Sequence, residues 1–444
     1  MLFAIAMLLL PQRPPLASGL DPLQIRQQLD WRFDQDYPQL EALYRDIHAH
    51  PELGFQEHRT AALLAARMRR LGFAVTEGVG RTGIVAVYHN GPGPVVLVRT
   101  ELDALPMKEQ TALPYRSQVQ ERLDGKLTDV AHSCGHDIHM AWWVGTAQAL
   151  VALKGVWHGT LLFIGQPAEE EISGARAMLA DGLFSRFPRP DYGFAAHVGP
   201  ALAGTVVVKQ GVVSSASDAM AITFRGVGAH GAMPDKSIDP IIEGTHFVDD
   251  VQTVISREKD PQKFGVVTVG AFNAGSVGNI IPDHADLQLT LRSFDPGVRR
   301  LLIQGVTATA LAVAQMAHAP APLVLHPRGT GSVVNDPALA AGTADALAAA
   351  LGKQNVTLVP VDAPGGSASE DYSEYGVAGL TRSVYFSIGG HTQATLDRYK
   401  AQGKPVPVNH SPEFAPDPQT SIRTGVETLS LAVILVAQAP AVIP

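Results

Sequence analysis

The feature that most constrains the fold is the apolar run VVLVR at 95–99. Its side chains do not alternate between apolar and polar, so both faces of the predicted strand are expected to be buried, as in a parallel sheet. Further predicted strands at 161–165 and 192–198 alternate with predicted helices at about 137–154 and 175–180. The sequence therefore predicts an α/β fold, in which helices cover both faces of a mostly parallel sheet.

Two helices are predicted before this strand. Apolar residues spaced i, i+3, i+4 and i+7 indicate a helix from about Asp36 to Pro51, where the proline ends it. A second helical face begins at Ala61 and is followed by Gly72, a typical helix stop. Near the C-terminus, a final helix is predicted at about 418–438.

The segment at 216–329 has a different pattern. Its predicted elements follow the order β-α-β-β-α-β, and apolar residues alternate with polar ones from Ala285 to Arg292. This order is typical of a ferredoxin-like unit, so we expect a small lid domain inserted into the α/β domain. The 444 residues then divide into a leader at 1–19, a main domain made of 20–215 and 330–444, and the lid.

Charge and cysteine content exclude a nucleic-acid-binding protein and a protein stabilised by intramolecular disulfides. The 34 Lys and Arg residues and 42 Asp and Glu residues give a net charge of −8, which lacks the basic footprint of a nucleic-acid-binding protein. The single cysteine, Cys134, stands among 16 histidines and cannot form an intramolecular disulfide. A buried, inert thiol is the commoner role of a free cysteine, so any other role must be indicated by its neighbours.

The N-terminus carries a possible export signal. The apolar run from Leu2 to Leu10 has the length of a signal-peptide core, is too short to cross a bilayer, and is followed by small residues at 17–19. We therefore expect a periplasmic or secreted protein. Because no Lys or Arg precedes the run, a cytoplasmic protein is the alternative. The apolar run at 431–437 is also too short to span a membrane and predicts one face of the last helix.

Polar residues collect where the predicted strands end. Glu101 and Asp103 follow the first strand, the three glutamates at 169–171 follow the second, and His197 closes the third. Ligands of open α/β sheets bind outside the carboxyl ends of the strands. We therefore expect these side chains along one rim of the sheet.

The segment HSCGHDIH at 132–139 adds a thiol and imidazoles to this rim. Cys134 and His136 are two residues apart, so both would point to the same side of an extended segment. Such a pair binds a soft or borderline divalent metal, or acts as nucleophile and base. A core cysteine beside helix-entry histidines is the simpler alternative.

The acids of QPAEEE at 166–171 could divide metal binding and proton transfer between them, although consecutive carboxylates usually form a solvated loop.

His197 and His410 are weak signals taken singly, because a lone histidine of this kind is more often a satisfied core residue. Together, the motifs occur in an order that resembles the two-metal amidohydrolases of the aminoacylase and carboxypeptidase superfamily. Within it, they resemble the branch that contains hippurate hydrolase and the indole-acetyl-amino-acid hydrolases. The matching segments are DIHAHPELGFQE at 46–57, TELDALP at 100–106, HSCGHDIH, QPAEEE, AAHV, GAHGAMP at 228–234, NIIPDHADLQLTLRSF at 279–294, SEDYSEYG at 369–376 and NHSPEF.

This resemblance implies a site with two divalent metal ions per subunit, which would be Zn, Mn or Co. The implied ligands are Cys134, His136, Glu170, His197 and His410. The main α/β domain would then be the catalytic domain.

The resemblance also implies roles around the metals. Glu169 would be the general base, and Asp103 would orient a ligand. His230, on the lid, would reach into a partner subunit's active site and stabilise the oxyanion, which implies a homo-oligomer formed through the lid. Asn279 and Arg292 would contact substrate, although a solvated residue on the outer face of its strand explains Arg292 nearly as well.

The implied reaction is hydrolysis of an N-acyl amino acid or a similar small-molecule amide by a metal-bound water. A dipeptidase or carboxypeptidase on the same fold is an alternative. Outside the family, the alternatives are an enzyme with Cys134 as nucleophile and a non-catalytic periplasmic binding protein, and neither uses Glu169. Departures from the branch at 100–103, at 229–232 and at Ile138 remove no ligand, but they leave the substrate open.

Overall fold

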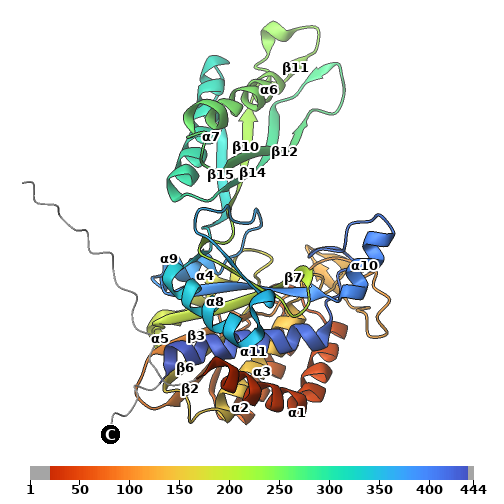
Figure 1. The fold of residues 1–444 in the computed structure, drawn as a ribbon. Helices are drawn as coiled ribbons and strands as arrows, with labels where there is room; N and C mark the ends of the chain where they lie inside the picture. The colour runs from red at the N-terminus through yellow and green to blue at the C-terminus, as the bar shows by residue number, and fades with distance from the viewer. Residues whose placement is uncertain (1–20, 439–444) are drawn as a thin grey trace, which may run out of the picture.

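The computed structural model describes residues 21–438 as two parts (Figure 1). The lower part in this view, which we call the body, holds the large sheet, and the segment between 216 and 330 forms a separate unit that rises from it. The predicted leader at 1–19 lies outside the described residues. Its export function stays a prediction.

The body is built on a mixed sheet of eight strands. Four central strands, β6, β3, β7 and β18, run parallel to one another, and antiparallel strands flank them. The predicted mostly parallel α/β sheet is thereby confirmed. The strand order is β1 (Ala74–Val79), β2 (Gly83–Asn90), β6 (Gly159–Gln166), β3 (Val95–Glu101), β7 (Tyr192–Leu202), β18 (Ser383–His391), β8 (Val206–Lys209) and β17 (Val356–Val359).

Helices cover both faces of this sheet. Along β3, Val96 and Val98 join the apolar cluster on one face and Leu97 joins the cluster on the other, as the two-residue period of a strand requires. The first face is covered by α1 (Pro22–Ala49), α2 (His58–Arg70), α3 (His136–Ala152), α8 (Pro337–Leu351) and α11 (Pro418–Ala437). The second is covered by α4 (Gly174–Ala180), α5 (Leu183–Arg186) and α9 (Ser373–Val377).

Helix α1 begins well before the predicted start near Asp36. It starts at Pro22, where the Asp21 side chain accepts the backbone N–H of Leu23, an arrangement that stabilises helix N-termini. Its first half buries only Ile25, Leu29 and Phe33, at intervals of four residues in a polar stretch. The sequence pattern there was too sparse to predict a helix.

The inserted unit contains a four-stranded antiparallel sheet in the order β12-β14-β10-β15. Two helices, α6 and α7, pack on it around a separate apolar cluster. The first helical region of this unit divides into α6 and a π-helical turn, Val254–Glu258. The elements are β10 (Ala216–Arg225), α6 (Pro240–Asp250), β12 (Gly265–Ala274), β14 (His284–Ser293), α7 (Pro296–Met316) and β15 (Leu323–Thr330), with the short strands β11 (Ala229–His230) and β13 (Ile280–Ile281).

The remaining short elements lie in the connections. They are β4 (Gln120–Leu123), β5 (Lys126–Asp129), β9 (Gly211–Val212), β16 (Val334–Asn335) and α10 (Gln393–Ala401). The last helix, α11, is longer than the apolar run at 431–437 and, by length and composition, could cross a membrane. However, 78% of its most apolar window is buried inside the protein, so it packs as a core helix of this fold.

Candidate metal centre

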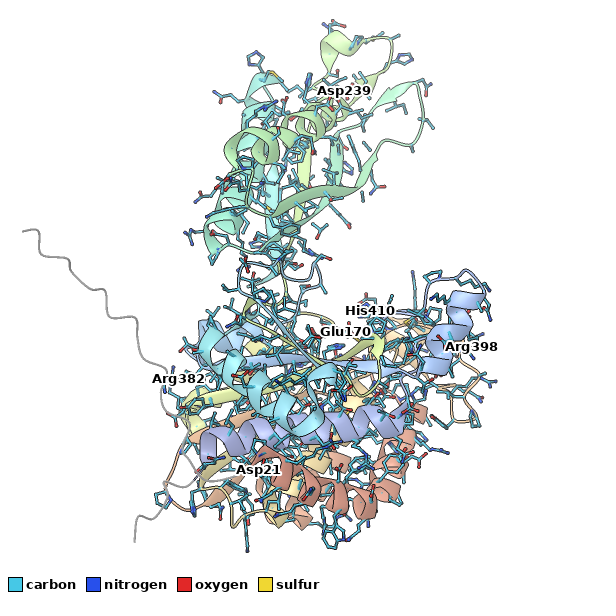
Figure 2. All side chains as sticks on the ribbon, in the orientation of Figure 1. Asp21, Glu170, Asp239, Arg382, Arg398 and His410 are labelled. Carbon is cyan, nitrogen blue, oxygen red and sulfur yellow. The ribbon has the colours of Figure 1, made fainter. Side chains whose placement is uncertain are left out.

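The predicted rim brings side chains from four segments together, beyond the carboxyl ends of β3 and β6 and beside the middle of β7. Glu170 and His410 lie beside each other on the body (Figure 2), with His410 Nε2 3.3 Å from Glu170 Oε2. His136 Nε2 lies 3.9 Å from Glu170 Oε1, and Cys134 Sγ lies 3.4 Å from His197 Nε2. All five predicted ligands are therefore neighbours, although they span 134–410 in the chain.

Cys134 and His136 meet for a different reason from the one predicted. They do not lie in an extended segment: Cys134 is in a turn and His136 is the first residue of α3. Gly135 between them has a φ of 92°, and a Cβ there would lie 2.4 Å from Val198 Cγ1. Glycine is thus required both by the left-handed backbone and by the close approach of β7.

The two imidazoles present their Nε2 atoms to the centre of the cluster. His136 Nδ1 donates to the Asp103 carbonyl oxygen at 2.9 Å, and His197 Nδ1 donates to the Val198 carbonyl at 2.8 Å. Because each Nδ1 is used in this way, the Nε2 atoms keep their lone pairs for a ligand when the rings are neutral. His197 lies within β7 and does not end it, since the strand continues to Leu202.

Unpartnered buried atoms show that this donor set fits a metal. Among the described residues, His136 Nε2, Glu170 Oε1 and Asp103 Oδ1 are buried without a hydrogen-bond partner, a costly arrangement unless an ion satisfies them. Donor atoms of Cys134, His136 and Glu170 lie within 4.8 Å of one another. A thiol, an imidazole and a carboxylate suit a borderline ion such as zinc.

Asp103 and Asn409 connect the predicted ligands to one another. Asp103 Oδ1 lies 3.3 Å from His136 Nδ1, and its Oδ2 accepts the backbone N–H of Glu170 at 2.9 Å. The Asn409 side chain donates to the carbonyls of Cys134 and Val198, at 2.9 and 3.0 Å. Asn409 precedes His410, so its amide ties three ligand-bearing segments together. It was not among the predicted site residues.

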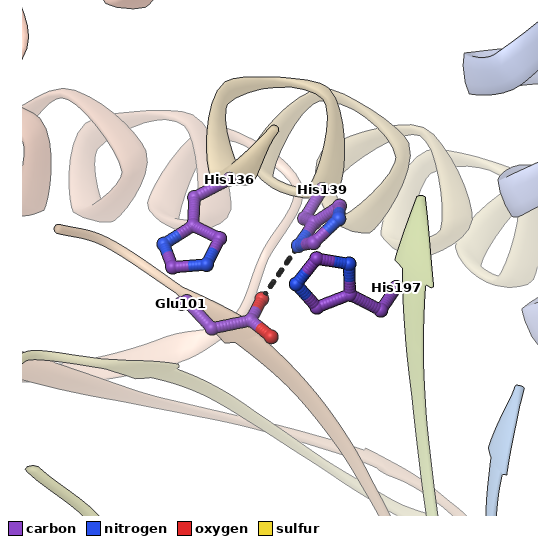
Figure 3. Close-up of side chains that lie close together, drawn as sticks. All are labelled: Glu101, His136, His139 and His197. Carbon is purple, nitrogen blue, oxygen red and sulfur yellow. Dashed lines mark hydrogen bonds and ion pairs between the residues drawn. The ribbon is translucent and has the colours of Figure 1, made fainter. Parts of the chain in front are cut away.

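Glu101 and His139 also lie in the cluster, beside His136 and His197 (Figure 3). His139 Nδ1 donates to Glu101 Oε2 at 2.9 Å, and its Nε2 accepts the Val198 N–H at 2.9 Å. Both ring nitrogens are therefore used within the protein, and neither is free for a metal. The sequence signal that could have placed His139 in this cluster is its position one helical turn after His136 on α3.

A second group of buried charges lies next to Glu169. Arg99 is fully buried and contacts Glu101, Glu370 and Asp371, the last two at 2.7 and 3.3 Å. Oxygens of Glu169, Glu370 and Asp371 lie within 4.8 Å of one another. Glu370 lies in the segment SEDYSEYG at 369–376, but no role was predicted for it, because its partner Arg99 is far away in the chain.

Burial and mutual repulsion favour protonated groups in the metal-free cluster. Burial raises the pKa of Glu170 to about 7, opposed by His136 and assisted by Asp103. Burial, together with Glu370 and Glu170, raises the pKa of Glu169 well above its usual range. Burial, together with Glu170 and Glu169, likewise raises the pKa of the Cys134 thiol. A divalent cation would replace these protons.

His48 forms a separate buried ion pair behind the site. Its Nδ1 lies 2.6 Å from Asp137 Oδ2 and its Nε2 3.1 Å from Glu109 Oε1. Although burial lowers the pKa of His48, the hydrogen bonds to Asp137 and Glu109 raise it to about 9. A folded-state pKa above the unfolded value means that this charge stabilises the fold below about pH 6.5, and that the stabilisation is lost as the pH rises through 9.

We therefore predict a pH-dependent stability difference between the wild type and His48→Gln. The wild-type advantage in free energy of unfolding should shrink by about 3 kcal/mol between pH 6.5 and roughly pH 10, because the shift in the His48 pKa is from 6.5 to about 9. Urea unfolding of both proteins across this range is the measurement. A difference that stays constant with pH would show that His48 is neutral in the folded protein.

Three predicted site residues on the inserted unit do not reach this centre within one chain. His230 is exposed on β11, at the end of the unit farthest from the body (Figure 1). Asn279 is exposed, and its carbonyl accepts the Gly231 N–H. Arg292 is half-buried on the outward-facing side of β14 and donates to Thr290 Oγ1 at 2.5 Å.

Comparison with known proteins adds independent evidence. The family model described as peptidase family M20/M25/M40 matches residues 97–412. A hippurate hydrolase of Campylobacter jejuni is 37% identical over 62% of this chain and 70% of its own length. An N-acetylcysteine deacetylase of Bacillus subtilis is 34% identical over 74% of this chain and 83% of its own length. The crystal structure of a Bacillus subtilis dinuclear metal-binding peptidase of the M20 family superimposes with a TM-score of 0.71, at 26% identity, over 91% of this chain and all of that one.

Proposed function

The chain belongs to peptidase family M20/M25/M40 and is a metal-dependent amidohydrolase, and on this premise we propose that it hydrolyses N-acyl amino acids. The observation that carries the proposal is the pair of buried, unpartnered atoms His136 Nε2 and Glu170 Oε1, with Glu169 immediately beside them. The names of the relatives, a hippurate hydrolase and a deacetylase, support an N-acylated amino acid as the substrate class.

Cys134, His136, Glu170, His197 and His410 would hold two divalent ions. Such ions polarise an amide carbonyl and lower the pKa of water. The protein would contribute a preformed set of ligands: Asp103 orients His136 and the Glu170 backbone, and Asn409 fixes the loop of His410. These hydrogen bonds hold the donor atoms in place before an ion arrives.

Glu169 would act as the general base. Its side chain is 7% exposed, and its Oε2 lies 3.9 Å from His136 Nε2, on the same side as Glu170. From there it would accept a proton from the attacking water and deliver it to the departing nitrogen. The buried group around Arg99 would keep Glu169 surrounded by fixed charges rather than by solvent.

The inserted unit would complete the site from a second subunit. Since His230 lies far from Glu170 and His410 in its own chain, its proposed contact with the oxyanion requires a partner subunit or a large movement of the unit. Asn279 and Arg292 would bind the free carboxylate of the substrate from the same unit. A homo-oligomer formed through this unit is part of the proposal.

The substrate class is tested with a matched pair of amides. Hippurate and phenylalanyl-glycine are similar in size, but only the dipeptide carries a free amino group. We expect kcat/KM for hippurate to exceed that for the dipeptide by about 100-fold or more, because a buried amine without a partner is costly. Faster dipeptide hydrolysis would establish the dipeptidase alternative. The metal content of the same protein is measured alongside. Less than one ion per chain, together with no cleavage of any amide, would overturn the proposed function.

A further inference from the structure

The loop that carries Glu169 and Glu170 has a backbone that needs support. Ala168 and Ile172, which bracket the three glutamates, have φ values of 45° and 53°. L-amino acids rarely adopt this left-handed region, and β-branched residues do so least readily. Such conformations persist only where the surrounding structure holds them. The contacts of this loop therefore identify what keeps Glu169 in place.

Glu57 provides the principal contact. Its side chain is fully buried, and its Oε1 accepts the backbone N–H of Ala168 at 2.8 Å. Its Oε2 accepts a hydrogen bond from the Thr82 hydroxyl. The Ala168 carbonyl in turn accepts the N–H of Gly174 at 3.1 Å, at the start of α4. The peptide groups on both sides of the left-handed residue are thus fixed.

Glu57 is not needed by its own helix. It precedes the first residue of α2, yet its side chain makes no hydrogen bond to the start of that helix. Glu52 caps the helix instead, because its carboxylate accepts the N–H groups of Arg59 and Thr60, at 2.9 and 2.7 Å. Glu52 and Glu57 therefore lie in one segment but support different elements, α2 and the turn at Ala168. Substitution of Glu52 is thus a matched control for substitution of Glu57.

The rest of the segment is shaped to fit the loop. A Cβ on Gly54 would lie 2.9 Å from Glu171 Oε1 and 3.1 Å from Ala168 Cβ. Phe55 next to it is also left-handed, with a φ of 59°, and its ring lies under the Arg81 guanidinium at 4.0 Å. Backbone of an uncommon conformation is thus present on both sides of the contact, as is typical of functional sites.

We propose that Glu57 is a positioning residue, which holds the left-handed turn at Ala168 and thereby aims Glu169 at the reacting water. This inference rests on the proposed function in one respect, that Glu169 is the base. Glu57 itself touches neither a predicted metal ligand's side chain nor Glu169 among the described contacts. Its effect should therefore appear in turnover rather than in metal content.

The test compares Glu57→Ala, Glu57→Gln and Glu52→Ala in the metal-loaded protein. We expect Glu57→Ala to lower kcat by about 10- to 100-fold, with KM and metal content nearly unchanged. Glu57→Gln should keep most of the activity, because its amide oxygen still accepts the Ala168 N–H and its amide hydrogens can face the Thr82 oxygen. Glu52→Ala should lower the melting temperature without lowering kcat.

A double variant makes the test specific to the turn. Glycine adopts a φ near 45° without a steric penalty. Adding Ala168→Gly to Glu57→Ala should therefore restore kcat several-fold, whereas Ala168→Gly alone should behave like the wild type. Equal losses of kcat in the Glu52 and Glu57 alanine variants, or no rescue by Ala168→Gly, would overturn the proposal.

Hydrogen exchange separates this inference from the proposed function. Amides at 168–172 should exchange faster in Glu57→Ala than in the wild type or in Glu52→Ala, whether or not the protein hydrolyses any tested amide. If the wild type proves inactive on all amides, the proposed function fails while the exchange result still decides whether Glu57 holds the turn. Unchanged exchange, or faster exchange with unchanged kcat, would refute the positioning role.

Discussion

Glu169→Gln is expected to lower kcat by about 10³- to 10⁴-fold while leaving the metal content unchanged. Glu169 is buried beside His136 and Glu170, but its carboxylate is not one of the unpartnered atoms that face the predicted metal position. The substitution keeps the size of the side chain and removes only its ability to take a proton. The measurements are steady-state kinetics on the best N-acyl amino acid and metal analysis of the same samples.

Glu171→Gln is the matched control for this experiment. Glu171 belongs to the same turn and is half-buried, so its substitution makes the same chemical change next to the site. We expect it to keep kcat within about three-fold of the wild type, as substitutions outside the reacting groups usually do. Near-normal turnover in Glu169→Gln, or equal losses in both variants, would exclude Glu169 as the base.

The large features of this structure could be predicted because their signals are local. The run VVLVR, apolar on both faces, corresponds to β3 in the middle of the parallel strands. Strict alternation from Ala285 to Leu291 corresponds to β14, whose odd-numbered residues are buried. In both segments the periodicity of the side chains records directly which faces are covered.

The precise geometry of the site could not be predicted, because it depends on backbone torsions and on distant partners. Cys134 and His136 converge through a left-handed Gly135 and the start of a helix, whereas the two-residue spacing suggested an extended segment. Glu57 and Ala168 are joined by one hydrogen bond across 111 residues of sequence. No pattern within a window of the sequence contains such a contact.

The same reasoning explains why the buried charges were missed. Arg99 follows four apolar residues in β3, and its partners Glu370 and Asp371 come from a loop 271 and 272 positions later. Each charge alone is expected at the surface, because an unpaired buried charge is prohibitively costly. Only the folded chain, which places this loop against Arg99, brings the opposite charges together in the interior.

Removal of the metals should abolish turnover, and their return should depend strongly on pH. Exhaustive chelation is expected to reduce activity by more than about 10³-fold, since the reaction depends on the charge that the ions supply. Zn²⁺ or Mn²⁺ added back at about pH 8 should restore it. Full activity after verified metal removal would contradict the whole assignment of the site.

The pH dependence follows from the protons that the metal-free cluster holds. Burial keeps the thiol of Cys134 protonated, and it raises the pKa of Glu170 to about 7. For His136, burial lowers the pKa, but Asp103 and Glu101 raise it to about 10. At about pH 8 Glu170 has already lost most of its proton, whereas Cys134 and His136 must each lose one to bind an ion, so binding is expected to release about two protons. The apparent affinity should then rise by about 100-fold per pH unit.

Calorimetric titration with Zn²⁺ in two buffers of different ionisation enthalpy counts these protons directly. In Cys134→Ser the count should fall by about one, because the hydroxyl keeps its proton, and the affinity should fall with it. Ser133 precedes the ligand, and its backbone carbonyl accepts the His410 N–H. Ser133→Ala keeps that carbonyl and should leave the count unchanged. An unchanged count in Cys134→Ser would mean that the thiol is not a ligand, and Cys134 would then be the buried, inert cysteine that composition alone favours.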